Sequence, residues 1–289
     1  MAKQEAHLYR DAYFVVRDGL RLHYRDYPGA ADRPPILCLH GLTRNARDFA
    51  ALAGRYSPNF RVLALDFRGR GESDYDPLPA RYNPLSYASD VLELLDTLKI
   101  EQAVFVGTSL GGLVMMTLAV TAPQRIAAAI LNDVGPELNQ AGLDRIRIYV
   151  GKGEEFAGWH EAAKAIAGNQ SAAFPSYDES AWLAMAQRNC REKDGKIVFD
   201  YDPAIADVFK AGPTPKIDLW PLFAALAQKP LLIIRGERSE LLSAETLERM
   251  KAAAPDVRVA VVTNVGHPPM LDEPEAVAAI DAFLDSLAK

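Results

Sequence analysis

Short apolar runs alternate with amphipathic helical stretches along most of this chain of 289 residues. Runs such as Ala103–Gly107 and Ala127–Asn132 are almost wholly apolar, which is typical of parallel strands buried on both faces. This succession predicts an α/β fold with a mostly parallel, eight-stranded sheet flanked by helices. The expected strands are Tyr13–Val16, Leu20–Tyr27, Ile36–His40, Arg61–Asp66, Ala103–Gly107, Ala127–Asn132, Leu231–Arg235 and Val257–Val262. The expected helices of this part are Ala46–Tyr56, Tyr87–Leu98, Leu110–Ala122, Ala244–Ala254 and Glu275–Ala288.

The alternation is interrupted between about Gly135 and Trp220. This stretch holds three helical patterns, no convincing buried strand and, within it or at its edge, all three tryptophans. We interpret residues 135–220 as a helical cap inserted into a core made of residues 1–134 and 221–289. The alternative is a helical layer packed on the sheet without a role as a lid. The expected cap helices are Asn139–Val150, Gly158–Ile166 and Glu179–Arg191.

The charge of the chain argues against two classes of partner. The sequence has 38 acidic and 32 basic residues, a formal net charge of −6, and no run of Lys or Arg. Binding to nucleic acid or to anionic lipid is therefore not expected. The uncharged stretch Gln102–Gln124 is long enough to cross a bilayer. Its glycines and Pro123 divide it into a strand, a turn and a helix, so no membrane span is expected.

Cysteine and histidine spacing gives no sign of a metal site. The two cysteines, Cys38 and Cys190, lack CxxC spacing, and no pair of histidines has the spacing of metal ligands. No metal and no cofactor are therefore expected. The first residues contain no apolar segment of the kind that directs secretion, so a cytoplasmic location is expected.

A G-x-S-x-G motif, Gly107-Thr108-Ser109-Leu110-Gly111, joins an expected strand to an expected helix. A serine on such a sharp turn needs glycine two residues before and after it, because larger side chains would collide there. The turn presents the hydroxyl of Ser109 at the carboxyl end of the sheet as a candidate nucleophile. It also directs the backbone N–H of Leu110, at the start of the helix, toward a developing oxyanion.

Two histidine-containing loops complete the candidate constellation. His267, in Asn264–Pro269, follows the last expected strand, so that it can meet Ser109 across the sheet and act as general base. The loop His40-Gly41-Leu42 follows an earlier strand, and the N–H of Leu42 is a candidate second oxyanion donor. His40 itself is expected to be a hydrogen-bonded structural residue.

These segments, in this order, resemble the α/β-hydrolase superfamily. The stretch Asp66-Phe67-Arg68-Gly69-Arg70-Gly71-Glu72-Ser73 is similar to the D-x-R-G-x-G-x-S segment of that family. The resemblance implies the α/β-hydrolase fold with a cap, and it implies structural rather than catalytic roles for this segment, whose charge pair and glycines shape the loop.

The acid that would orient His267 has more than one candidate. The resemblance places it most often after the strand Leu231–Arg235, where Glu240 occupies the position at which many relatives have Asp. The rival is Asp133, at the end of the preceding strand, where some relatives place the acid. Glu237 is a third candidate. We favour Glu240.

A serine nucleophile with a histidine base implies acyl transfer to water, so a serine carboxylesterase is the first hypothesis. The alternatives on the same residues are a carbon–carbon bond hydrolase, a lactonase, a thioesterase and a peptidase. A non-catalytic ligand-binding protein of this fold is a further alternative.

Small or medium apolar esters are the expected substrates, with synthetic ester polymers included. The candidate pocket residues are Arg44, Trp159 and Trp182, although the tryptophans could equally pack the cap and Arg44 could brace its loop. The sequence shows no basic cluster facing the serine, and it leaves the oligomeric state open.

Overall fold

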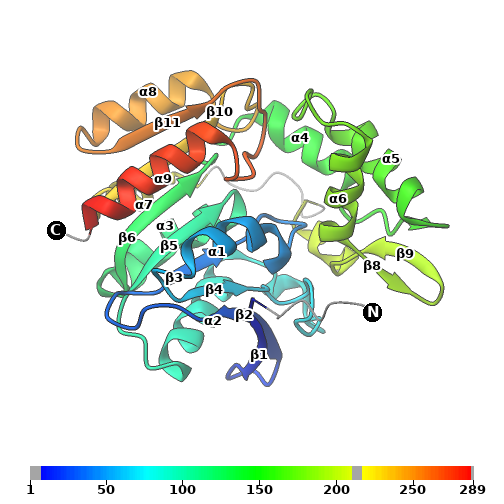
Figure 1. The fold of residues 1–289 in the computed structure, drawn as a ribbon, viewed down its shortest axis with the longest axis horizontal. Coiled ribbons are helices and arrows are strands. Elements are labelled where there is room, and N and C mark those ends of the chain that lie inside the picture. Colours follow the sequence, from blue (N-terminus) through cyan, green and yellow to red (C-terminus); the bar gives the residue numbers. More distant parts are fainter. Residues whose placement is uncertain (1–7, 210–216, 288–289) are drawn as a thin grey trace.

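A computed structural model describes residues 8–209 and 217–287 of the chain (Figure 1). Its centre is an eight-stranded sheet with the strand order β1-β2-β4-β3-β5-β6-β10-β11. Strand β1 pairs antiparallel with β2, and β2 pairs antiparallel with β4, while all the other pairings are parallel. The strands are β1 (Arg10–Val15), β2 (Arg21–Tyr27), β3 (Ile36–Leu39), β4 (Val62–Leu65), β5 (Ala103–Thr108), β6 (Ile126–Asn132), β10 (Leu231–Gly236) and β11 (Arg258–Val262). The expected mostly parallel sheet is confirmed.

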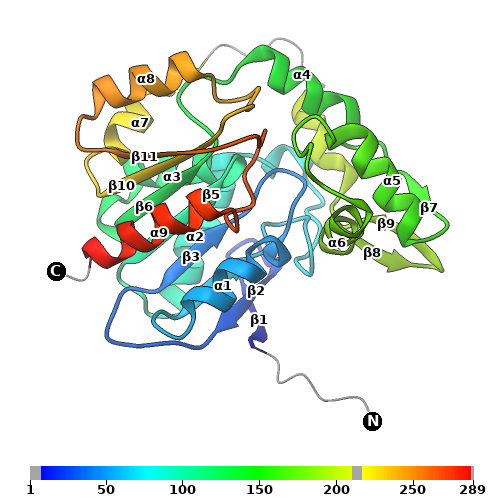
Figure 2. The same ribbon diagram turned by 45° about the horizontal axis from the view of Figure 1, so that its top comes forward.

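Helices cover both faces of this sheet, and the alternation of side chains along each strand explains why. In β3, Leu37 and Leu39 join one buried apolar cluster, whereas Ile36 and Cys38 join a second cluster on the opposite face. The first cluster includes side chains of α2 (Pro84–Thr97), α3 (Leu110–Thr121), α7 (Trp220–Leu226) and α8 (Ala244–Ala253). The second includes side chains of α1 (Ala50–Tyr56) and α9 (Pro274–Leu287), which lie together in Figure 2. None of the described helices is both long enough and apolar enough to cross a membrane.

The segment between β6 and α7 lies beyond one end of the sheet (Figures 1 and 2). It contains the three expected helices, α4 (Gln140–Tyr149), α5 (Trp159–Gln170) and α6 (Glu179–Asn189). It also contains a small antiparallel sheet of β7 (Glu155–Phe156), β9 (Lys196–Phe199) and β8 (Cys190–Lys193). The expectation of a wholly helical segment is therefore wrong. These strands are short, β8 is rich in charged residues and β9 has only the brief apolar run Ile197–Phe199, so the pattern of a buried strand is weak.

The loop after β3 fastens this segment to the core. The amide of Asn45 and the guanidinium of Arg47 both donate to the carbonyl oxygen of Arg188, each at 2.8 Å, near the end of α6. Arg47 also contacts the fully buried carboxylate of Asp200 at 2.5 Å. A single core loop therefore holds two parts of the 135–220 segment.

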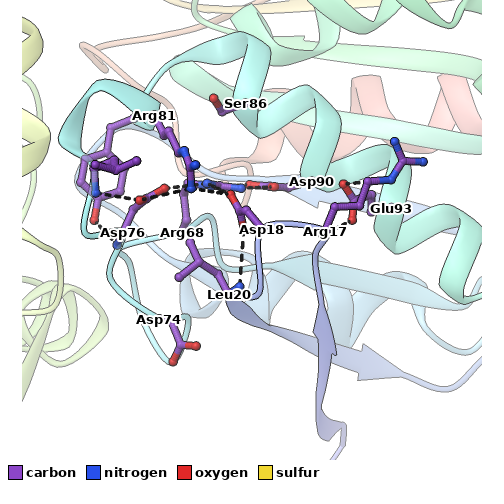
Figure 3. A network of polar contacts seen from close by, with 12 residues as sticks. Arg17, Asp18, Leu20, Arg68, Asp74, Asp76, Arg81, Ser86, Asp90 and Glu93 are labelled. Carbon is purple, nitrogen blue, oxygen red and sulfur yellow. Dashed lines mark hydrogen bonds and ion pairs between the residues drawn. The ribbon is translucent and has the colours of Figure 1, made fainter.

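A buried charge network shapes the loop after β4 (Figure 3). The guanidinium of Arg68 contacts Asp90 at 2.8 and 2.5 Å, Asp76 at 2.6 Å and Asp18 at 2.8 Å. The side chains of Arg68, Asp76 and Asp90 are at most 4% exposed. Burial raises the pKa of Asp90 to about 6, against the opposing effect of Arg68.

Asp66 and Arg68, treated above as a charge pair, have separate partners, so that expectation is wrong. Asp66 accepts hydrogen bonds from the backbone N–H groups of Ala46 and Glu72 and contacts the ring of His23 at 2.7 Å. The segment shapes its loop through these two independent clusters.

Replacing Arg68 with Met should lower the free energy of unfolding by about 3–5 kcal/mol at pH 7.5, because the buried Asp90 would lose its cation and Asp76 would keep only Arg81, at 3.9 Å. Arg81→Met is the matched control. Its side chain is 40% exposed and contacts Asp18 at 3.2 Å and Asp76 only at 3.9 Å, so its loss should cost about 0–1 kcal/mol. Urea unfolding measures both values. The deficit of Arg68→Met should shrink at pH 5.5, because burial raises the pKa of Asp90 and protonation then neutralises this stranded carboxylate. Equal losses in the two variants would contradict this account.

Candidate active site

Ser109 lies on the turn between β5 and α3, with φ 51° and ψ −112°. A positive φ strains a non-glycine backbone, and the surroundings of the turn hold it in place. A Cβ atom at Gly107 would lie 2.7 Å from the backbone of Gly111, and one at Gly111 would lie 2.0 Å from the carbonyl oxygen of Leu39. Only glycine fits at these two positions, so the turn can pack against β3.

His267 lies on the loop after β11, where it connects Ser109 with Asp133. Its Nε2 atom is 3.0 Å from the Oγ of Ser109, and its Nδ1 atom is 2.8 Å from Oδ2 of Asp133. Asp133 directly follows β6 and is completely buried. Its other oxygen accepts the backbone N–H of Gly236, at the end of the neighbouring strand β10, at 2.9 Å. The carboxyl ends of three parallel strands therefore bring a hydroxyl, an imidazole and a carboxylate into one hydrogen-bonded chain.

Glu240 does not contact His267, so the preference for Glu240 over Asp133 is corrected. The carboxylate of Glu240 is half exposed and accepts a hydrogen bond from Arg145 of α4 at 2.8 Å. The reason is the turn after β10, in which the N–H of Ser239 bonds back to Gly236 and the N–H of Arg238 bonds to Val265. This turn carries Glu240 away from the histidine.

Glu237, the third candidate, is also occupied elsewhere, because it accepts the backbone N–H of Asn264 at 2.7 Å. One sequence signal favoured Asp133. It directly follows an apolar run without a basic neighbour, whereas Glu237 and Glu240 lie in a polar stretch. A carboxylate that is buried in this way needs donors from elsewhere in the fold.

The N–H groups of Leu42 and Leu110 are both available as donors beside Ser109. Leu110 is the first residue of α3, so its N–H has no partner within the helix. Neither N–H donates to another group in the described ranges 8–209 and 217–287. Both groups therefore remain the candidate oxyanion donors that the sequence predicts.

His40 fixes the peptide that presents the Leu42 N–H. Its Nδ1 atom donates to the carbonyl oxygen of Gly41 at 2.7 Å, and its Nε2 atom accepts the N–H of Phe67 at 3.1 Å. Complete burial lowers the pKa of His40 to about 4, so the ring is neutral near pH 7. Since the carbonyl oxygen and the N–H of a trans peptide point in opposite directions, holding the Gly41 oxygen orients the Leu42 N–H.

A cavity opens beside Ser109 and His267, and residues of the core and of α4 line it. Ile146 and Tyr149 of α4 form an apolar wall, and Arg44 also lines the cavity. The guanidinium of Arg44 is held by Asp48 at 2.6 and 2.9 Å, so it braces its own loop as well. Arg145, Arg238 and Glu240 lie along the same cavity. The absence of a basic cluster inferred from the sequence is therefore wrong, because the fold gathers three arginines that lie far apart in the chain.

Neither Trp159 nor Trp182 is among the residues that line this cavity. Trp182 is 8% exposed and packs edge-on against Phe174 and Tyr177, and Trp159 packs against the same apolar cluster. Their interpretation as pocket residues is replaced by the packing alternative. Within the described part of the chain, no group of three or more His, Cys, Asp or Glu residues could hold a metal ion.

The chain is similar to known proteins over most of its length. A model of the alpha/beta hydrolase family matches residues 36–280. The chain is 31% identical over 272 residues to a 3-hydroxybutyrate-oligomer hydrolase of Cupriavidus necator, covering 91% of this chain and 92% of that protein. It is 30% identical over 255 residues to a 2-(acetamidomethylene)succinate hydrolase of Mesorhizobium japonicum, covering 88% of each. The crystal structure of an alpha/beta hydrolase from Novosphingobium aromaticivorans is 50% identical and superimposes with a TM-score of 0.92, covering 96% of this chain and 98% of that one. The resemblance drawn from the sequence motifs is thereby confirmed, and the chain belongs to the alpha/beta hydrolase family.

Proposed function

We propose that this protein is a serine hydrolase that cleaves carboxylic esters through an acyl-enzyme. The observation that carries the proposal is the unbroken chain of contacts from Ser109 through His267 to Asp133, at 3.0 and 2.8 Å. A serine hydroxyl is a weak nucleophile, and an adjacent imidazole that removes its proton activates it. The buried carboxylate of Asp133 holds the imidazole in the tautomer with the proton on Nδ1, which leaves Nε2 free to accept.

In the first half-reaction, the Oγ of Ser109 attacks the ester carbonyl while Nε2 of His267 takes its proton. The N–H groups of Leu42 and Leu110 stabilise the negative charge that develops on the carbonyl oxygen. The C–O bond of the ester then breaks, and His267 returns the proton to the departing alcohol. In the second half-reaction, a water molecule repeats the attack on the acyl-enzyme and releases the acid. Asp133 balances the positive charge of the imidazolium throughout.

The names of relatives support ester cleavage. The relative from Cupriavidus necator is named for oligomers of 3-hydroxybutyrate, and hydroxy acids join to one another through ester bonds. A second relative, 25% identical over 264 residues, is named an esterase. We place short aliphatic esters and oligoesters first among substrates, because the wall formed by Ile146 and Tyr149 is apolar. In this proposal the segment 135–220 is a cap that forms one wall of the substrate site.

Ser109→Ala should reduce ester hydrolysis by a factor on the order of a million, because the attacking oxygen is lost. The wild-type protein should react with a fluorophosphonate probe and the variant should not. Ser180→Ala, which removes an exposed hydroxyl of α6, is the matched control and should keep both properties. Labelling of Ser109→Ala at the wild-type rate would show that the reactive group lies elsewhere.

Asp133→Asn should lower kcat by about ten-thousand-fold on a neutral ester such as p-nitrophenyl butyrate. The corresponding change in a serine protease has that effect, because the amide favours the wrong imidazole tautomer. Glu240→Gln should lose far less activity, because Glu240 contacts Arg145 and not His267. Both rates are measured on folded protein checked by circular dichroism. A larger loss in Glu240→Gln would return the orienting role to that residue.

Trp182→Ala should lower the melting temperature without changing the preferred length of the acyl chain, since the side chain is buried within the cap. Removing a buried tryptophan side chain costs about 3–5 kcal/mol. Ile146→Ala should instead shift the preference in a series of p-nitrophenyl esters toward longer chains, because Ile146 lines the cavity. A shift in chain-length preference for Trp182→Ala alone would contradict the packing interpretation.

A further inference from the structure

We propose that the cavity beside Ser109 selects esters that also carry a carboxylate, which Arg145 and Arg238 bind at the rim. This inference rests on the ester hydrolysis proposed above and specifies the class of ester. It names the rim, defined here as Arg145, Arg238 and Glu240, as the subsite that recognises the anion.

The local charge of the cavity is opposite to that of the chain. The chain carries a formal charge of −6, whereas the lining contains Arg44, Arg145 and Arg238 against one carboxylate, Glu240. Asp48 neutralises Arg44 through two hydrogen bonds. Even so, one positive charge remains in excess at the rim. A concave site with an excess of one sign attracts ligands of the other sign.

Arg238 provides that excess charge. Its side chain is exposed, and no carboxylate of the described residues pairs with it. Both neighbouring acids are engaged, Glu237 by the N–H of Asn264 and Glu240 by Arg145. The backbone of Arg238 is nevertheless fixed, because its N–H donates to the carbonyl oxygen of Val265 at 2.8 Å. The protein therefore holds an unpaired guanidinium at the cavity from a rigid turn.

Arg145 can bind the same substrate carboxylate as Arg238 with little loss of folding free energy. Its two contacts are Glu240 at 2.8 Å and the carbonyl oxygen of Asn169 at 3.0 Å. The pair with Glu240 is partly exposed, with side-chain exposures of 29% and 50%. Exposed pairs of this kind contribute little stability, so an incoming carboxylate can share or replace Glu240. One carboxylate is then bound by two guanidinium groups, one from α4 and one from the turn after β10, in the forked geometry that arginine favours.

Matched pairs of esters test the proposal. The first pair, 3-(butanoyloxy)butanoic acid and its primary amide, places the carboxylate on the alcohol side of the ester. The second pair, monobutyl adipate and its primary amide, places it on the acyl side. Wild-type kcat/KM should favour the acid over the amide by about tenfold in at least one pair, mainly through KM, because hydrogen bonds to charged groups are the stronger ones.

Variants at the rim should move this acid-to-amide ratio in opposite directions. Arg238→Gln and Arg145→Gln should each lower it, to near one in the double variant. Glu240→Gln should raise it, because Arg145 loses its internal competitor. Arg17→Gln is the control for overall charge, since Arg17 is 88% exposed on the loop after β1, and it should leave the ratio unchanged.

Calorimetry on Ser109→Ala measures binding of the acid without turnover. Adding Arg238→Gln and Arg145→Gln together to that variant should raise the Kd for the acid by about tenfold. The proposed subsite is wrong if the wild-type enzyme hydrolyses the acid and the amide of each pair equally, or if the double variant keeps the preference for the acid. Either result would leave the proposed ester hydrolysis intact. If no ester is cleaved and Ser109 is not labelled, the proposed function fails, and the calorimetry still decides whether the rim binds carboxylates.

Discussion

The two hydrogen bonds made by the carboxylate of Asp133 are the constraint on which the site depends. One oxygen accepts the N–H of Gly236 at the end of β10, and the other faces Nδ1 of His267 on the loop after β11. A fully buried carboxylate is stable only when such donors satisfy it. Asp133 therefore locks the ends of neighbouring strands in register, and the same contacts fix the plane of the imidazole that faces Ser109. Fold stability and the geometry of the candidate site come from the same atoms.

The sequence reveals the sheet and two of the three residues of the hydrogen-bonded chain, Ser109 and His267 but not Asp133, for a clear reason. Long apolar runs identify parallel strands, and the carboxyl ends of such strands meet at one edge, so Ser109 and His267 had to lie near each other. The apolar runs do not decide which acid orients His267, because Asp133 and Glu240 follow adjacent strands. The hydrogen bonds of the turn after β10 decide it, and no periodicity encodes them. Strands β7 to β9 escaped prediction because they are short and partly polar.

The distribution of charge also depends on the fold rather than on composition. Arg145 and Arg238 are far apart in an acidic chain, and the strand order that places β10 beside β6 brings them to one cavity. The interior charges follow a different rule. Arg68 meets its three carboxylates in a closed network, which satisfies each buried group. Buried arginines thus maintain the loops, whereas the exposed Arg238 lines the cavity beside Ser109.

The loop after β3 carries the Leu42 N–H near one end and, a few residues later, Asn45 and Arg47, which hold the end of α6 and Asp200. The N–H of Ala46, between these anchors, is tied to Asp66 of the core. This short stretch therefore connects the 135–220 segment, the core and the Leu42 peptide within a few residues. The contacts that hold α6 to the core and the peptide of Leu42 thus belong to one loop. In the proposed mechanism, a mutation that loosens the contacts between α6 and the core, although remote from Ser109, would change the rate of the chemical step through this loop.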